Sequence, residues 1–157
     1  MPLSPFIAGL RAKIGNDLLL LPSVSAIILD DAGRVLLQRA SEDRKWYIIG
    51  GSMEPGEQPA HSVVREVKEE TGLDVEPLRV TGVYATERVT YANGHQCEFV
   101  STTFLCRVIG GTLSVADDES LEFRYFAPDA LPDLRPDHRR RIADALDDRP
   151  AAHFVRP

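Results

Sequence analysis

A predicted helix with a glycine on each side dominates the middle of this 157-residue chain. Residues 51–73 read GSMEPGEQPAHSVVREVKEETGL. Proline has no N–H to lose in the first turn of a helix, so Pro59 suits the start. Gly72 suits the position after the last turn, where a positive φ is needed. We therefore predict a helix from about Pro59 to about Thr71.

Two stripes of this helix differ in their chemistry. At about 100° per residue, three glutamates lie at i, i+3 and i+4, roughly 115° round the helix from an apolar stripe. The glutamates are Glu66, Glu69 and Glu70, and the apolar residues are Ala60, Val63, Val64 and Val67. We expect the apolar stripe to face the core, which leaves the acids beside it.

Three carboxylates within one helical turn need a compensating cation, because like charges at this spacing repel and the repulsion grows with burial. Carboxylate oxygens favour a hard divalent metal, Mg²⁺ or Mn²⁺, over softer ions. Because Mg²⁺ usually keeps several waters and takes phosphate oxygens as further ligands, the cluster implies a phosphorylated substrate.

The residues around the helix fill every position of the pattern G-x5-E-x7-R-E-U-x-E-E-x-G-U, in which U is a bulky apolar residue. Chance agreement is on the order of 10⁻⁹ per register at ordinary amino-acid frequencies. The segment 51–73 resembles the Nudix box, and by this resemblance the chain is identified as a Nudix (MutT-type) hydrolase. The simpler alternative, a solvated acidic helix, accounts for the glutamates but not for Gly51, Arg65 and Gly72.

The resemblance implies a role for each charged residue of the helix. Glu69 and Glu70 are expected to be metal ligands, and Glu66 to bind a metal or to help activate water. Arg65 is expected to orient these neighbours. The reaction implied is attack of metal-activated water on phosphorus.

Two further metal contacts are implied at the entrance to the box. Glu57 is expected to bind Arg65 or a further metal, and the carbonyl of Gly50 to complete the coordination shell. Many relatives have proline where this chain has Ile49, which keeps the backbone extended but loses the restraint on φ. This departure puts in doubt the fine geometry of the Gly50 carbonyl and not the metal site.

Candidates outside the box come from loops and strand ends. A base or further ligand is expected among Asp117, Asp118, Glu119 and Glu122, with Glu119 favoured because it shortly precedes the aromatic segment 123–126. For the substrate, relatives use an arginine at the position of Arg39 on phosphate, with a solvated strand-end charge as the alternative. The rings of Trp46 and Tyr84 can stack on a base or sugar, with core packing as the default.

Strand signals surround the predicted helix. Strands are predicted at 23–29, 35–38, 46–49, 78–90, 98–108 and 123–126, with a tight turn at 30–33 and a hairpin tip at Asn93-Gly94. One helix is expected between Ser4 and Gly15 and another over 137–146. We expect an α+β chain with the Nudix fold, an α/β/α sandwich around a central mixed β-sheet. The expected single domain spans 1–157 and begins with a helical segment at 1–16.

The net charge of −6 and the pI near 5.2 argue against long nucleic acid or an anionic membrane as partner, because both select basic surfaces. No signal peptide or membrane span is predicted. Cys97 and Cys106 are expected on opposite faces of one strand as reduced, buried thiols, which indicates a cytoplasmic location. The basic run 138–141 is expected to be a solvated helix start rather than a phosphate site.

The sequence thus predicts hydrolysis of the diphosphate bond in a small nucleotide, a nucleoside diphosphate linked to a moiety X such as ADP-ribose, a dinucleotide or a nucleotide sugar. The downstream proline of many ADP-ribose hydrolases has no counterpart, since no proline lies between Pro77 and Pro128. Three alternatives stay open: a nucleoside triphosphate pyrophosphohydrolase, a prenyl diphosphate isomerase, and a nucleotide sensor without turnover. The isomerase usually needs a cysteine near the metal, and no cysteine of this chain is convincingly placed for that. A pure sensor could lose the box carboxylates, so their presence argues against a sensor. A homodimer is open too, because relatives are often dimers.

Overall fold

The computed structural model describes residues 4–115 and 119–156, which form one sheet and three helices. The helices are α1 (Pro5–Ile14), α2 (Pro59–Thr71) and α3 (Pro136–Leu146). The strands are β1 (Leu19–Leu29), β2 (Val35–Ala40), β3 (Trp46–Tyr47), β4 (Ile49–Ser52), β5 (Leu73–Ala85), β6 (Val89–Thr90), β7 (Gln96–Gly111), β8 (Ser120–Phe126) and β9 (His153–Phe154).

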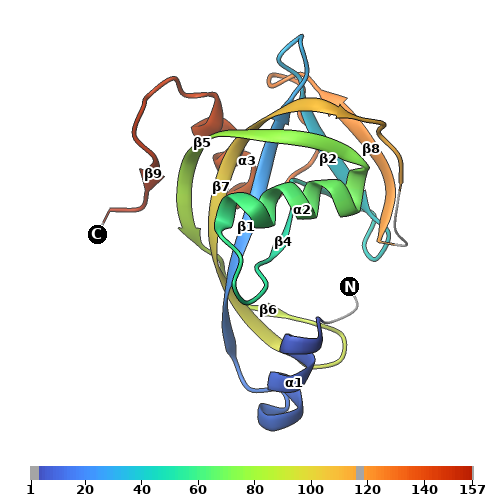
Figure 1. Cartoon of the computed structure of the whole chain (residues 1–157), viewed down its shortest axis with the longest axis vertical. Coiled ribbons are helices and arrows are strands. Elements are labelled where there is room, and N and C mark those ends of the chain that lie inside the picture. The colour runs from blue at the N-terminus through green and yellow to red at the C-terminus, as the bar shows by residue number, and fades with distance from the viewer. Residues whose placement is uncertain (1–3, 116–118, 157) are drawn as a thin grey trace.

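The sheet is mixed. Six strands follow the order β3-β2-β1-β7-β5-β9, while β4 pairs with β1, β6 with β7 and β8 with β2. Strands β1 and β7 run parallel, as do β5 and β9, and the other pairs are antiparallel. In Figure 1 helix α2 crosses one face of the sheet and α3 lies on the other. The expected α+β sandwich around a mixed sheet is confirmed.

Alternation along the central strand β1 explains why both faces are covered. Val24 and Ile28 point to one side and pack with Val67 of α2 in one core. Ile27 points to the other side and packs with Ile142 of α3 in a second core. Fully burying an aliphatic side chain of this size contributes roughly 1.5–3 kcal/mol, so each helix is held mainly by its apolar stripe.

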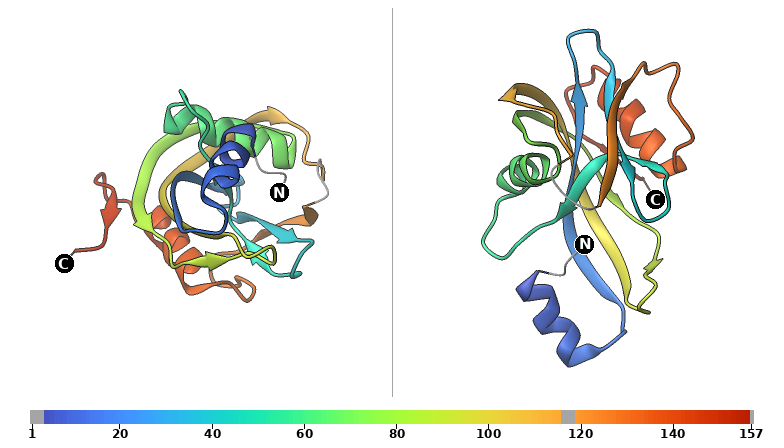
Figure 2. Two further views of the ribbon diagram at one scale, coloured as in Figure 1. Left: turned by 90° about the horizontal axis from the view of Figure 1, so that it is seen from below. Right: turned by 90° about the vertical axis from the view of Figure 1, so that its right-hand side faces the viewer.

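The predicted helix boundaries are confirmed by their capping residues. Gly72, which has a φ of +74°, directly follows the last residue of α2. The Ser4 side chain caps the first turn of α1, and Gly15 follows the last. Figure 2 shows α1 beyond one end of the sheet. There it contributes to a small core formed by Ile7, Leu21 and Cys97.

Strand lengths differ from the sequence expectation. Strand β5 begins at Leu73, the last residue of the box, rather than at residue 78. Pro77 sits at an irregularity of the β5–β7 pairing and therefore does not break the strand. The hairpin tip is confirmed, since the Gly94 N–H donates to the Tyr91 carbonyl at 2.8 Å. Strand β9 was not expected, because its two residues, His153 and Phe154, acquire strand character only by pairing with β5.

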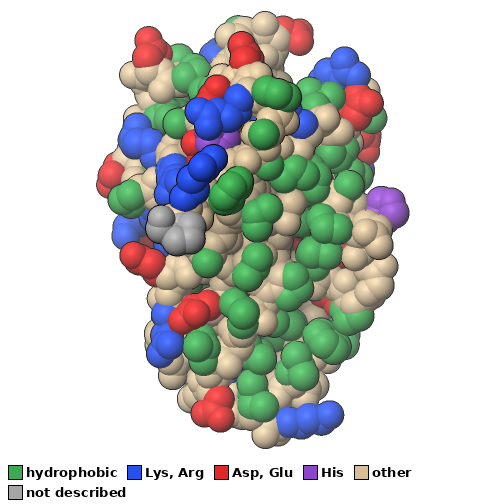
Figure 3. All heavy atoms as spheres, turned by 90° about the vertical axis from the view of Figure 1, so that its left-hand side faces the viewer, with side chains coloured by type: hydrophobic (Ala, Val, Ile, Leu, Met, Phe, Trp, Pro, Cys, Tyr) green, Lys and Arg blue, Asp and Glu red, His purple; other side chains and the backbone are tan. Residues whose placement is uncertain are grey.

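One flank of the molecule carries exposed hydrophobic side chains among charged ones. Figure 3 views the side on which β5 and β9 lie and shows hydrophobic side chains spread along it. Val83 of β5 and Phe154 of β9 are paired in register and are 42% and 61% exposed.

Within the described residues, no helix is long and apolar enough to span a membrane. Cys97 and Cys106 are free and buried in separate cores, as expected.

Candidate active site

The acidic face of α2 lies beside its buried face, as the helical spacing predicts. Val63 and Val67 are fully buried and fix the rotation of the helix about its axis. With this rotation Glu66 and Glu70 are each only 7% exposed. The Glu69 side chain is 60% exposed. Packing of the valines therefore holds two carboxylates at the boundary between the core and water.

Arg65 holds three of the box carboxylates together. Its Nε lies 2.7 Å from Glu57 Oε1, and its Nη1 lies 2.9 Å from Glu66 Oε1 and 3.0 Å from Glu69 Oε2. Its Nη2 also donates to the Ser52 carbonyl at 3.2 Å. A planar guanidinium with five donors can satisfy several acceptors at once, which a lysine cannot. The arrangement agrees with the orienting role expected for Arg65.

Glu57 is held in its charged form by several donors. The hydrogen bonds from Arg65, together with those from the Ser62 hydroxyl at 2.6 Å and the Glu54 N–H at 2.9 Å, lower its pKa to about 2. A carboxylate that accepts this many hydrogen bonds stays ionised at any physiological pH. Glu57 therefore anchors Arg65 in the position from which it reaches α2.

Glu66 lies directly against the glycine that opens the box. A Cβ on Gly51 would come within 2.3 Å of Glu66 Oε2, so no other residue fits there without moving the carboxylate. Burial raises the pKa of Glu66 even though Arg65 opposes the shift. A desolvated carboxylate gains more from a nearby cation than a hydrated one does. The close approach of Gly51 and the burial of the carboxylate distinguish Glu66 from a surface glutamate.

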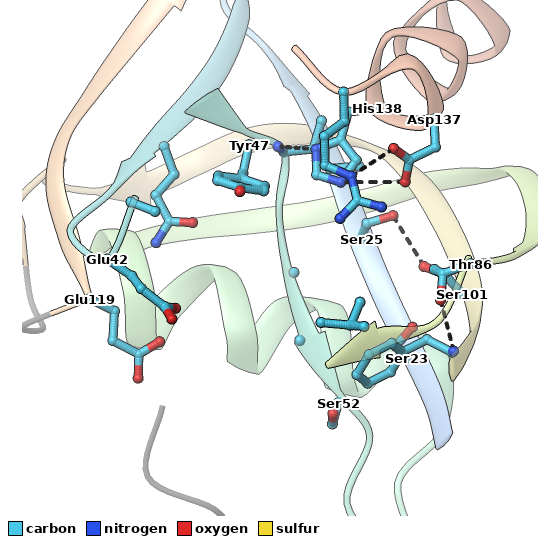
Figure 4. A pocket seen from close by; sticks show the side chains of 18 of the residues that line it. Ser23, Ser25, Glu42, Tyr47, Ser52, Thr86, Ser101, Glu119, Asp137 and His138 are labelled. Carbon is cyan, nitrogen blue, oxygen red and sulfur yellow. Dashed lines mark hydrogen bonds and ion pairs between the residues drawn. The ribbon is translucent and has the colours of Figure 1, made fainter. Parts of the chain in front are cut away.

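A cavity of about 1000 Å³ opens beside the box. On the box side it is lined by Gly50, Gly51, Ser52 and Glu70. Figure 4 shows Glu42 and Glu119 on one side of it and Asp137 and His138 on the opposite side. This volume is at the upper end of the usual range for ligand pockets, which suits a substrate with two large parts.

Of the loop acids considered as a base, the structure describes two. Glu119 lines the cavity. Glu122 does not, since its carboxylate pairs with Arg39 at 3.1 Å and Arg124 at 2.9 Å. Asp117 and Asp118 lie outside the described residues. The preference for Glu119 over Glu122 therefore agrees with the geometry, and a catalytic role for Glu119 stays a prediction.

The three candidate substrate contacts do not appear among the described residues that line the cavity. Arg39 is bonded to Glu122 and the Arg44 carbonyl. Trp46 packs edge-on against Phe126 at 4.8 Å. Tyr84 is 6% exposed beneath α3 and donates to Asp144 at 2.7 Å. For all three, direct contact with the substrate stays a prediction.

The first turns of α3 supply cavity residues from the basic run that was expected to be solvated. The expectation of a solvated basic run holds for Arg139 and Arg140, which are exposed, and is wrong for His138 and Arg141. Both line the cavity. Their spacing of three was the available signal, because it places them on the face of the helix that carries Ile142.

His138 makes stability depend on pH. Its side chain is 12% exposed, and burial lowers its pKa from 6.5 to about 4. Between these values the unfolded chain binds a proton that the folded chain does not, so stability falls as pH drops from 6.5 to 4. The contribution is at most about 3 kcal/mol. In urea unfolding, we expect His138→Gln to flatten this dependence and the exposed His61→Gln to leave it intact; equal slopes for wild type and His138→Gln would contradict the assignment.

The box residues suit a hard divalent cation by their chemistry. Their side-chain donors are carboxylate oxygens, and Glu66 is a buried carboxylate whose charge is only partly offset by Arg65. No group of three or more His, Cys, Asp or Glu stands assembled as a ligand set in residues 4–115 and 119–156. Arg65 holds Glu57, Glu66 and Glu69 together in the described part of the chain.

Comparison with known proteins identifies the family. A family model described as the NUDIX domain matches residues 19–146. The chain is 32% identical over 126 residues to a MutT-like protein of Streptomyces ambofaciens, which covers 80% of this chain and 76% of that protein. It is 36% identical over 126 residues to an ADP-ribose pyrophosphatase of Methanocaldococcus jannaschii, which covers 79% and 72%.

A solved structure extends the likeness to the fold. The MutT NUDIX hydrolase from Burkholderia pseudomallei superposes with a TM-score of 0.69 at 26% identity, which covers 82% of this chain and 99% of that one. This chain belongs to the NUDIX family. The expectation of an enzyme that acts on phosphoric anhydride bonds is thereby confirmed at the level of the family.

Proposed function

We propose that this chain hydrolyses the diphosphate bond of a nucleoside diphosphate linked to a moiety X, with the acidic face of α2 as the reactive end of its cavity. The observation that carries this proposal is the group of carboxylates that Arg65 holds next to Gly51 and Ser52, two residues that line a cavity of about 1000 Å³. An acidic cluster cannot attract a diphosphate by itself, so the proposal includes a divalent cation.

We assign the cation to Glu66, Glu69 and Glu70, with Glu57 and the Gly50 carbonyl as further ligands. Mg²⁺ is the proposed ion and Mn²⁺ its substitute. When bound, it supplies neutralisation of the diphosphate charge and a lower pKa for water. The chain itself orients the acids through Arg65. We assign acceptance of the water proton to Glu66, which lies against the cavity-lining Gly51, or to Glu119, which itself lines the cavity.

ADP-ribose, dinucleotides and nucleotide sugars are the proposed substrates. The ADP-ribose pyrophosphatase of Methanocaldococcus jannaschii supports the first of them through its 36% identity to this chain. We further propose that the chain acts as one domain, and that it works in the cytoplasm, which the two free thiols of Cys97 and Cys106 favour.

A substrate panel tests the proposal. ADP-ribose, NADH, diadenosine polyphosphates, nucleotide sugars, CoA and nucleoside triphosphates are incubated with Mg²⁺ or Mn²⁺, and phosphorylated products are measured for wild type and Glu69→Gln. We expect a nucleoside monophosphate and X-phosphate from at least one substrate, and loss of both in the variant. Turnover of triphosphates alone would instead support nucleotide-pool cleansing. Tight nucleotide binding without any turnover would support a sensor and overturn the proposal.

A further inference from the structure

The floor of the cavity is polar where a sheet interior is normally apolar. On the face of β1 and β7 toward α3, Ile27 and Leu105 pack in the core, but the next residues are Ser25, Ser101 and Thr103. These three are at most 3% exposed, and Ser25 and Thr103 share a hydrogen bond of 2.8 Å. Buried hydroxyls cost stability relative to apolar side chains, so their grouping beside a cavity calls for a function.

Arg141 lies on this polar floor. It is 4% exposed, and its Nη1 donates to Ser101 Oγ at 3.1 Å and to Ser25 Oγ at 3.4 Å. Its buried Nε has no hydrogen-bond partner in the described part of the chain. The Tyr84 ring lies 5.2 Å from the guanidinium and limits its movement. A buried guanidinium with one unsatisfied donor is costly unless a ligand completes its contacts.

Charge at this end of the cavity is positive. Arg135 Nε lies 3.0 Å and Arg141 Nη2 lies 3.9 Å from the carboxylate of Asp137, so two guanidiniums share one carboxylate. His138 is neutral when its Nδ1 accepts from the Ile48 N–H at 3.3 Å. Its Nε2 is then the donor nitrogen, and it lies 3.8 Å from Asp137 Oδ2. The box end of the cavity is acidic, so the two ends have opposite character.

We propose that Arg141, with the hydroxyl of Ser101 and the Nε2–H of His138, forms a subsite for an anionic oxygen group of the substrate, a carboxylate or a phosphate distant from the diphosphate that is cleaved. This inference rests on the proposed function. It implies that the substrate carries a further anionic group, either on the moiety X or as a phosphate on the nucleoside. The unsatisfied Arg141 Nε and the excess positive charge carry it. The role of Tyr84 is then to position Arg141 and not to stack on the substrate.

Calorimetry with matched ligand pairs tests the subsite. UDP-glucuronate and UDP-glucose differ by one carboxylate, and NADPH and NADH by one phosphate. Binding is measured with Ca²⁺ in place of Mg²⁺. Ca²⁺ takes the same oxygen ligands in a looser geometry, so the ligands can bind while the proposed turnover is slowed. Because charged hydrogen bonds are strong, we expect the anionic member of one pair to bind about tenfold or more tightly. The pair that shows this preference identifies the group as carboxylate or phosphate.

Variants on α3 test whether Arg141 causes the preference for the anionic ligand. Arg141→Gln is expected to bring the affinity ratio near one. Arg139→Gln removes the same charge from an exposed position of the same helix and should leave the ratio unchanged. If Arg141→Gln does not fold, Arg141→Lys is used. Loss of the planar guanidinium should then lower the affinity ratio by about threefold.

The two proposals fail in different ways. A wild-type ratio near one for both pairs, or a ratio that the folded Arg141 variants leave unchanged, overturns the subsite. Absence of turnover for every ligand with Mg²⁺ overturns the proposed function. In that case the affinity ratios still decide whether the subsite exists.

Discussion

Replacing Glu66 by glutamine is expected to lower kcat by about a hundredfold or more while changing stability by less than about 1 kcal/mol. Glutamine keeps the volume that packs against Gly51 and an oxygen that can accept from Arg65. It removes only the charge and the ability to take up a proton. Burial disfavours the charge of Glu66 in the folded state, so its removal should not be a large loss for folding.

A surface glutamate provides the matched control for Glu66→Gln. Glu76 on β5 also pairs with an arginine, Arg107, and is 48% exposed. Glu76→Gln should leave kcat within about twofold of wild type, because a surface pair of this kind contributes little. The measurement is initial rate against substrate concentration, with thermal unfolding as the check on stability. Full activity in Glu66→Gln would remove Glu66 from the mechanism.

Replacing Arg65 by leucine is expected to abolish activity and to destabilise the fold by about 2–4 kcal/mol, between the values for exposed and buried ion pairs. Arg65 contacts three carboxylates and one carbonyl, so leucine leaves Glu57, Glu66 and Glu69 to repel one another. Arg65→Lys keeps the charge but has fewer directed donors, and should recover part of the stability and little of the activity.

The pH dependence of stability separates this effect from a simple loss of packing. In the wild type the pKa of Glu57 is about 2, below its ordinary value of 4.5, and the largest cause is the hydrogen bond from Arg65. The resulting stability is fully present above pH 4.5 and is lost as pH falls toward 2. Arg65→Leu should lose most of this acid dependence in urea unfolding, whereas Arg107→Leu should retain it. An unchanged dependence in Arg65→Leu would show that Arg65 does not hold Glu57.

Local signals were sufficient to predict the box helix and its acidic face. Pro59 and Gly72 mark its ends by their own backbone preferences, and the spacing of Val63 and Val67 fixes which side is buried. These constraints act within a few residues, so they can be recognised from the sequence. The placement of Glu66 and Glu70 at the edge of the core, with Glu70 lining the cavity, follows from them directly.

The opposite end of the cavity could not be predicted in this way. Arg141 is buried because Ser25 and Ser101, from strands far away in sequence, supply its acceptors. From the sequence alone, a basic run at a helix start is expected to be solvated, because the packing of that helix is not known. Likewise, the strand positions of Trp46 and Tyr84 do not reveal which face opens on the cavity, and the structure gives both rings protein partners.

Metal dependence of diphosphate hydrolysis tests the central claim most directly. The best substrate of the panel is followed by phosphorus NMR with wild type and Glu66→Gln, first in a chelator and then during titration with Mg²⁺. The account predicts no product in the chelator, formation of a nucleoside monophosphate and X-phosphate as Mg²⁺ is added to wild type, and at most about one hundredth of that rate in Glu66→Gln. Hydrolysis that proceeds equally in the chelator, or equally in the variant, would contradict it.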